Sequence, residues 1–435
     1  MSHLLDPLLL TYQNPQWTQR LGQIHEAVRE ATYFEDGSEA DLNLTEIVQQ
    51  VRTGGDAALA ALTARFDGVT LTSAQFRVTR EDLQQAHAQV DADLMGSIRQ
   101  AIDHVRRYQS DIFVGDKIQH PGVRYSPLER VGVCVPGASA PLPSTVIMTA
   151  VPAQVAGVKD IALVSPPRTQ GSIHPVILAV CYELGIQEVY RVGGAQAVAA
   201  LAYGTETIKP VHKIVGPGNQ WVQMAKRKVF GRVDIDSIAG PSEVLIVAND
   251  QAHPDWIAAD MLSQAEHAPG SAVVLTDSVS VAEKTLAALK VQVQRLSRSQ
   301  ETIQCLTRFS AIIVCETMDQ VIDQANAFAS EHLEIQCGDA SRDIAARIKH
   351  AGALFVGPYT PVAVGDYWAG PSHTLPTGMT AKFFSPLSSN DFVKTTSVIE
   401  YSQEQLTQSA SHIMRLALTE GLDAHALSVG IRQED

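Results

Sequence analysis

The chain has 435 residues, of which 45% are hydrophobic and 18% charged, a composition typical of a soluble globular protein of two or three domains that excludes a disordered or fibrous chain. Its formal net charge of −14 argues against nucleic acid and anionic membrane surfaces as partners, because both attract basic patches. A small-molecule substrate is the better expectation.

The cysteines and the N-terminus predict a cytoplasmic protein. The five cysteines are an odd number, widely spaced and without a Cys-x-x-Cys motif, so neither a disulfide framework nor a cysteine-based zinc site is expected. The first residues show no basic region followed by an apolar core, and we therefore expect no secretion signal. Residues 131–158 carry no charge, but prolines interrupt them, which predicts strand, loop and buried helix in place of a membrane span.

Helices are predicted up to about residue 125, with apolar residues at helical spacing over 41–66 and 94–108. From residue 131, short apolar runs alternate with helix-length segments, and each run ends at a turn rich in glycine or proline. The predicted elements of this first series are strands at 131–135, 161–165, 188–192 and 213–215, with helices at 175–184 and 196–202.

A second series of strands follows, again separated by helices. Its predicted strands are 243–247, 272–275, 311–315, 333–337 and 353–356. Repeated strand, turn and helix indicate parallel sheets with helices on both faces, whose ligands bind at the carboxyl ends of the strands. We therefore expect an α/β fold of two similar doubly wound, Rossmann-like parallel-sheet domains with a helical N-terminal part. The expected parts are an arm at 1–25, a domain formed by 26–130 with 241–380, an inserted domain at 131–240, and a tail at 381–435 with a helix at 404–419.

The stretch 263–270 offers two metal ligands at the end of a helix. His253 and Pro254 indicate the start of this helix, and an apolar stripe with a spacing of four follows. Gln264 and His267 are three residues apart, so both project beside that stripe at the last turn, where unpaired carbonyls favour a cation. A capping or hydrogen-bonding pair is the alternative.

Three further segments carry carboxylates and imidazoles. Glu331 and His332 lie where a predicted helix at 318–328 passes into a strand, and together they can supply two bases of different strength. The others, in a turn-rich loop and near the C-terminus, are Asp366, His373, Glu420 and His425. The alternative for all of them is an exposed surface position, since charged side chains lie mostly at the surface.

Two cofactors are suggested by these residue types. Gln264, His267, Asp366 and His425 together would give two imidazole nitrogens and two oxygens, a ligand set suited to zinc, although their spacing leaves open whether they meet. The glycine turns suggest a nucleotide cofactor, yet the sequence contains no Gly-x-Gly-x-x-Gly fingerprint, and plain turn formation is the alternative.

Eight short runs resemble the histidinol dehydrogenase family, in the family's order and over most of the chain from about 127 to 430. The runs are 193–197, 216–219, 239–245, 263–267, 331–334, 365–367, 372–377 and 420–425. The resemblance implies an enzyme of histidine biosynthesis that oxidises L-histidinol through L-histidinal to L-histidine, reduces two NAD+ and holds one zinc ion per subunit. It also implies a homodimer with a swapped C-terminal tail that completes the site of the other subunit.

Carried over residue by residue, the resemblance assigns roles to single side chains. The zinc ligands that it implies are Gln264, His267, Asp366 and His425. The substrate contacts are these ligands together with Ser242, His332, His373 and Glu420. The NAD contacts are Cys134, Gln196 and Asn219. The expected domain at 26–130 with 241–380 would then hold zinc and substrate, the inserted domain would bind NAD, and the tail would form the dimer.

The chemistry of these residues agrees with that assignment. His332 would take the hydroxyl proton as a hydride leaves for NAD, and Glu331 would activate the water that hydrates the aldehyde before the second oxidation. Zinc has no redox chemistry, so its expected task is to hold the substrate against the nicotinamide. No cysteine matches a catalytic position of the family, which disfavours a thioester route.

Two positions depart from the family pattern. Cys134 stands where tyrosine is common, which removes a contact along the cofactor, and Ser372 stands where asparagine is usual, which leaves room for a water. Three alternative functions remain: oxidation of another small alcohol such as a sulfonated diol, hydrolysis by zinc and Glu331, and binding without catalysis. Glu420 argues against the first, because a carboxylate suits an imidazole N–H and repels a sulfonate.

Overall fold

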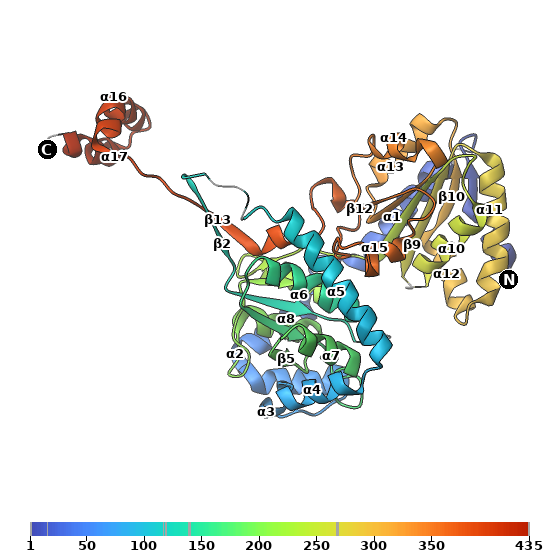
Figure 1. Cartoon of the computed structure of the whole chain (residues 1–435), viewed down its shortest axis with the longest axis horizontal. Coiled ribbons are helices and arrows are strands. Elements are labelled where there is room, and N and C mark those ends of the chain that lie inside the picture. The colour runs from blue at the N-terminus through green and yellow to red at the C-terminus, as the bar shows by residue number, and fades with distance from the viewer. Residues whose placement is uncertain are drawn as a thin grey trace. The chain divides into compact units, whose positions relative to one another are not determined.

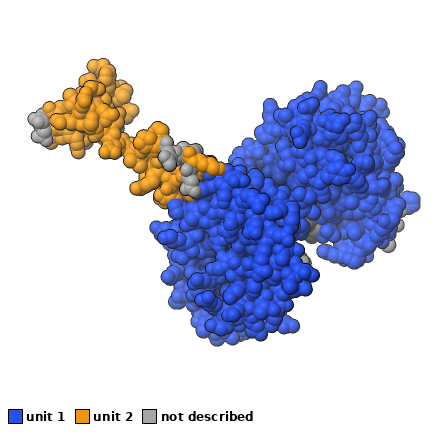
Figure 2. Space-filling model, in the orientation of Figure 1, with its two compact units in different colours: residues 1–113, 127–392 blue, residues 114–126, 393–435 orange. Residues whose placement is uncertain are grey.

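The computed structural model describes residues 2–14, 16–115, 117, 120–137, 141–266 and 269–433. The chain divides into two compact units, one formed by Met1–Phe113 with Pro127–Phe392 and the other by Val114–Ser126 with Val393–Asp435 (Figure 2). The first unit contains two parallel sheets flanked by helices (Figure 1), which confirms the predicted α/β class. Among the described residues, no helix has the length and apolar character needed to cross a membrane.

The larger sheet of the first unit has six parallel strands in the order β1-β10-β9-β8-β11-β12. Its strands are rich in Val, Ile and Leu and mostly buried on both faces, as expected for a parallel sheet covered by helices. The strands are β1 (Leu9–Thr11), β8 (Ser242–Ala248), β9 (Gly270–Thr276), β10 (Ala311–Val314), β11 (His332–Gln336) and β12 (Ala353–Val356).

Alternate residues of these strands enter two separate hydrophobic cores. Val244 and Ile246 of β8 join one core, and Leu245 and Val247 join the other. The helices of the first core are α10 (Pro254–Ala265), α11 (Val279–Gln292) and α12 (Ser299–Phe309). Those of the second are α1 (Gln16–Thr32), α13 (Met318–Phe328) and α14 (Ser341–Ala345), as Figure 1 shows.

The smaller sheet has five parallel strands in the order β5-β4-β3-β6-β7. They are β3 (Arg130–Cys134), β4 (Asp160–Val164), β5 (Glu188–Tyr190), β6 (Lys213–Val215) and β7 (Asp234–Ile235). Its crossover helices are α6 (Pro143–Val155), α7 (Pro175–Glu183), α8 (Gly194–Tyr203) and α9 (Gln220–Val229). Numbered from β3, the strand order is 3-2-1-4-5, so the topological switch point lies between β3 and β6.

The N-terminal helices pack differently from the domain division expected from the sequence. These helices are α2 (Glu39–Asp67), α3 (Ser73–Phe76), α4 (Arg80–Gln89) and α5 (Ala92–Ile112). The apolar face of α2 shares a core with α8 and the five-stranded sheet, while α4 and α5 contact α7 and α6. The expected grouping of 26–130 with 241–380 does not describe this packing, because an apolar stripe shows that a face is buried without showing against which sheet.

The nine predicted strands are all present, and their ends shift by no more than two residues. The sequence did not predict β1 and β7, nor the two strands that form a separate two-stranded sheet, β2 (Val123–Pro127) and β13 (Val393–Ser397). In place of a separate N-terminal arm, residues 9–11 add an edge strand to the six-stranded sheet. Strands of two or three residues carry too few side chains to show a periodic pattern.

The second unit ends in two helices, α16 (Gln403–Thr419) and α17 (Asp423–Gly430), which pack on each other. Large apolar side chains of this pair are exposed, with Leu416 at 68% and Leu427 at 67% of their full surface. Apolar side chains exposed in such number are typical of a surface that another chain segment covers.

Candidate active site

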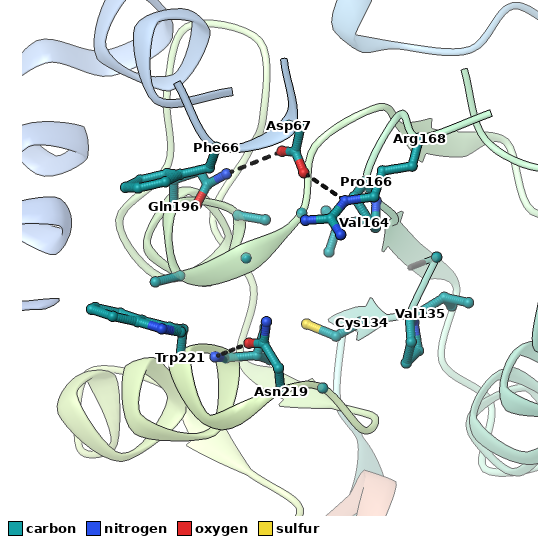
Figure 3. Close-up of a pocket in the computed structure, with 18 of the residues that line it drawn as sticks. Phe66, Asp67, Cys134, Val135, Val164, Pro166, Arg168, Gln196, Asn219 and Trp221 are labelled. Atoms are coloured by element: carbon teal, nitrogen blue, oxygen red, sulfur yellow. Dashed lines mark hydrogen bonds and ion pairs between the residues drawn. The ribbon is translucent and has the colours of Figure 1, made fainter. Parts of the chain in front are cut away.

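A cavity of about 450 Å³ opens at the carboxyl ends of β3, β4 and β6 (Figure 3). The turns that follow these strands, the Gly193–Gly194 turn after β5 and the C-terminal end of α2 form its wall. This is the switch point of the five-stranded sheet, where ligands of doubly wound folds bind. The sequence predicted a ligand at this edge, and the cavity lies there.

Polar side chains of this cavity are fixed by hydrogen bonds. Gln196, 2% exposed, approaches Asp67 with Nε2 at 3.5 Å from Oδ2, and Arg168 donates from Nε to Asp67 Oδ1 at 3.2 Å (Figure 3). Burial raises the pKa of Asp67. Asn219 accepts a hydrogen bond from the backbone N–H of Val222 at 3.2 Å and so caps α9. Apolar walls with a few placed polar groups are typical of cofactor pockets.

Cys134, the last residue of β3, also lines the cavity and is buried. Burial raises the pKa of its thiol to about 12. The sulfur therefore stays protonated near neutral pH and is no nucleophile, since the thiolate is the reactive form.

A second cluster of polar side chains lies at the amino end of the six-stranded sheet. Ser242 is the first residue of β8 and His332 the first of β11, and these two strands are neighbours. Glu331 Oε2 accepts the backbone N–H of Glu243 at 2.8 Å, and its carboxylate is hydrogen-bonded to the Ser242 side chain. Glu331 and His332 are 5% and 4% exposed, so the surface alternative is wrong for this pair.

The imidazole of His332 is held in one orientation. Its Nδ1 lies 2.9 Å from the backbone carbonyl of Glu243, and a carbonyl only accepts hydrogen bonds, so Nδ1 carries the proton of the neutral ring. Nε2 then carries the lone pair, and it lies 3.9 Å from Oδ1 of Asp366. The histidine therefore presents a base to the space around Asp366.

Three acids in this cluster have raised pKa values. Burial, followed by the charges of Glu243 and Asp366, raises the pKa of Glu331 well above its ordinary value. Burial alone raises the pKa of Glu243 to about 7 and that of Asp366 to about 6. Desolvation lowers the pKa of His373 to about 4. Raised pKa values of this kind are expected where buried carboxyl groups have no positive charge beside them.

Asp366 reaches the cluster from α15 (Val362–Tyr367). The first N–H of this helix, on Val362, donates to the buried Glu334 of β11 at 3.1 Å, which ties the helix to the strand that carries His332. Asp366, His332 and His373 line a small cavity of about 100 Å³. The structure thus brings Ser242, Glu331, His332, Asp366 and His373 to one end of the sheet.

Of the other predicted zinc ligands, Gln264 lies near this group, because it adjoins Gly270 of β9, the residue that pairs with Ser242 of β8. Gln264 lies in the last turn of α10, 3% exposed, and its Nε2 has no hydrogen-bond partner among the described residues. His267 lies outside the described residues. Glu420 and His425 are exposed in the second unit. Across the described part of the chain, no three His, Cys, Asp or Glu side chains form a group that could hold a metal ion.

The sequence analysis missed three polar residues of the cavity and of the cluster around His332. Glu243 was seen only as part of a motif, and its buried carboxyl and its contact with His332 arise from strand pairing. Asp67 and Arg168 meet across 101 positions of the chain. Neither has a local pattern, and only the turn after β4, rich in proline, gave a signal near Arg168.

A cavity at the switch point of a Rossmann-type sheet and a buried histidine–carboxylate pair are typical of an α/β enzyme that binds a cofactor. Residues 32–433 match the family model of histidinol dehydrogenase. The chain therefore belongs to the histidinol dehydrogenase family, and it is an NAD-dependent oxidoreductase.

Relatives cover nearly the whole chain. The histidinol dehydrogenase of Geobacillus kaustophilus is 46% identical over 409 residues, which are 92% of this chain and 96% of the relative. That of Bacillus subtilis is 45% identical over 394 residues, 89% of this chain and 92% of the relative. The crystal structure of histidinol dehydrogenase from Elizabethkingia anophelis has a TM-score of 0.88 at 32% identity and covers 98% of both chains.

Proposed function

We propose that this enzyme oxidises L-histidinol through L-histidinal to L-histidine, with zinc and NAD, in histidine biosynthesis. Family membership supports the substrate, and one geometric observation supports the chemistry. The fixed Nδ1–H of His332 leaves the Nε2 lone pair of a buried imidazole directed at the space beside Asp366. A buried base with a defined tautomer is what abstraction of a hydroxyl proton requires.

His332 acts as the base in both oxidations. In the first it takes the hydroxyl proton of the alcohol, and in the second it takes a proton of the hydrated aldehyde. The Glu243 carbonyl, 2.9 Å from Nδ1, stabilises the imidazolium that forms each time. The strand pairing of β8 with β11 keeps this carbonyl in place.

Glu331 activates the water that adds to the aldehyde. Its carboxyl is buried beside His332, with Oε2 at 3.5 Å from Nδ1. Its raised pKa keeps the group protonated until positive charge enters the cluster. Water activation by Glu331 is therefore coupled to the loading of the site.

The residues present fit a zinc ion. The acids of the cluster lack a cation, and the orphaned amide of Gln264 presents a ligand oxygen once its N and O are exchanged by a flip. Gln264, His267, Asp366 and His425 would hold the ion. Bound there, zinc would supply positive charge that orients the substrate and lowers the pKa of the nearby carboxyl groups.

The cavity of the five-stranded sheet is the proposed NAD site. Cys134, Gln196 and Asn219 all line it, with Phe66 and Trp221 as aromatic wall (Figure 3). NAD supplies the hydride acceptor for each oxidation. The chain's own part is to hold the cofactor by these turns and to exclude water with the apolar wall.

The enzyme is proposed to act as a homodimer in the cytoplasm. The exposed leucines of α16 and α17 suit a surface covered by a second copy, whose site would receive Glu420 and His425. Glu420 would accept the imidazole N–H of the substrate. All five cysteines are buried thiols, which suits a reducing compartment.

The test is the number of NADH formed per L-histidinol consumed, measured with and without a chelator. We expect two NADH per substrate, loss of turnover after chelation and recovery with zinc. One NADH per substrate would refute the four-electron reaction. No NADH would point to a hydrolase or a binding protein, and faster turnover of a sulfonated diol would change the assigned substrate.

A further inference from the structure

A buried ion pair holds Gly216, the residue just before the cavity-lining turn at Pro217–Asn219, through both its N–H and its carbonyl. Gly216 follows β6 and begins the turn that leads to Asn219. Its N–H donates to Asp236 Oδ2 at 2.7 Å, and its carbonyl accepts a hydrogen bond from Lys226 Nζ at 3.1 Å. Lys226 and Asp236 also pair with each other. The two charges and the glycine form a closed set of contacts.

Gly216 can occupy this place only because it has no side chain. Its φ of +109° lies in the region that favours glycine, and a Cβ would meet the backbone oxygen of Cys134 at 2.3 Å. The turn therefore lies directly against the end of β3, where Cys134 lines the cavity. A shift of Gly216 would therefore move the residues that follow it, Pro217 to Asn219, which line the cavity.

The ion pair is costly to bury and does not line the cavity. The side chains of Lys226 and Asp236 are 1% and 4% exposed, and neither is among the residues of the cavity wall. Removing two charges from water costs several kcal/mol per ion, so an apolar pair would serve stability at least as well. Holding Gly216 is the task that an apolar pair could not perform.

The same cluster fixes the start of the segment that leads to the second site. Asp236 Oδ1 accepts the N–H of Ser237 at 2.7 Å. Gln223, on the same helix as Lys226, accepts the N–H of Ala239 at 3.0 Å. Residues 236–241 then connect β7 to β8, whose first residue is Ser242. The contacts on Gly216 and on this connection therefore share one buried cluster.

We propose that Lys226 and Asp236 are positioning residues for the cofactor, which set its affinity by fixing Gly216 without touching the cofactor. The inference rests on the proposed binding of NAD in this cavity. It predicts that loss of the pair raises KM for NAD and leaves kcat and KM for L-histidinol nearly unchanged. If the pair had a merely structural role, its loss would lower stability without raising KM for NAD selectively.

The test variant is K226M/D236L, which removes both charges and leaves no unpaired charge in the interior. The full-length variant is compared with wild type in steady-state kinetics and in a fluorescence titration with NADH. We expect a rise in KM for NAD and in Kd for NADH of about tenfold, which corresponds to about 1.4 kcal/mol. The matched control is K228M, on the same helix, whose partly exposed ion pair with Asp41 has no contact with Gly216. It should behave as wild type.

An unchanged KM for NAD in folded K226M/D236L overturns the inference. If that variant does not fold, K226M alone is used to test the inference, because Asp236 then keeps its hydrogen bonds from the backbone N–H groups of Gly216 and Ser237. A severalfold rise in KM for NAD supports the inference, and a value equal to that of K228M refutes it. Gln196→Ala separates the two proposals: if it too leaves NAD binding unchanged, the cofactor site itself is wrong, and if it weakens binding while K226M/D236L does not, only the positioning role fails.

Discussion

Replacement of Glu243 by glutamine should make stability less dependent on pH. The side chain is 1% exposed on β8, its Oε2 accepts the N–H of Gly378 at 3.1 Å, and its Oε1 has no hydrogen-bond partner in the described part of the chain. Burial raises its pKa from 4.5 to about 7. Glutamine keeps an oxygen for Gly378 and removes the charge.

The magnitude follows from the shift in pKa. Below about pH 4.5 the carboxyl is protonated in the folded and unfolded states, and its contribution to stability is complete. As pH rises to about 7 the unfolded state ionises first, so the wild-type protein loses up to about 3 kcal/mol that the Gln variant retains. Above pH 7 both states are ionised, and the difference between the proteins stays constant.

The assay is urea unfolding of both proteins across this pH range, followed by the same spectroscopic signal. The free energy of unfolding of Glu243→Gln minus that of wild type should grow from near zero at the acid end to its full value near pH 8. Glu301→Gln, at an exposed position of the same unit, is the control and should show no such trend. A difference that is the same at every pH would refute the assignment of a raised pKa to Glu243.

Three further predictions concern the two sites. Glu331→Gln should slow the aldehyde step by about a hundredfold or more while sparing the alcohol step, and equal losses in the two half-reactions would show its assignment to be wrong. His425→Asn should reduce the zinc content of the purified enzyme while His412→Asn, on α16, retains it; full occupancy in the first variant removes His425 from the site. Gly216→Ala should weaken NADH binding by about 1–3 kcal/mol. Gly231→Ala is the control and should not, because Gly231 also has a positive φ, of +94°, but a Cβ there would meet no neighbouring atom.

Strand positions could be predicted because buried parallel strands are continuous apolar runs bounded by turns. The runs at β6 and β12 gave the observed bounds without change. The place of α2 could not be predicted, because its apolar stripe fits the face of either sheet. The cavity itself was foreseen only as an edge of the sheet, since its wall combines turns with the end of α2.

The site was predictable in residue type and not in environment. Glu331 and His332 are residue types that usually lie at the surface. Their burial depends on the backbone of Glu243, whose N–H donates to the Glu331 carboxylate and whose carbonyl accepts from the His332 ring. A cavity lies at the carboxyl ends of strands, between β3 and β6, where the sequence predicted a ligand. Ser242 and His332 lie at the opposite, amino ends of their strands.

This reversal follows from the order of the chain. β7 ends at Ile235, at the carboxyl end of the five-stranded sheet, where the cavity lies. β8 begins at Ser242, at the amino end of the six-stranded sheet, where His332 lies. Seven Cα–Cα steps separate these two residues, so they lie at most about 25 Å apart even when the connection is fully extended. In the proposed reaction a hydride acceptor and a base must reach the same carbon atom. A direct connection from the carboxyl end of β7 to the amino end of β8 limits the distance between the two proposed sites, and a base at the carboxyl end of β8 would add the length of that strand.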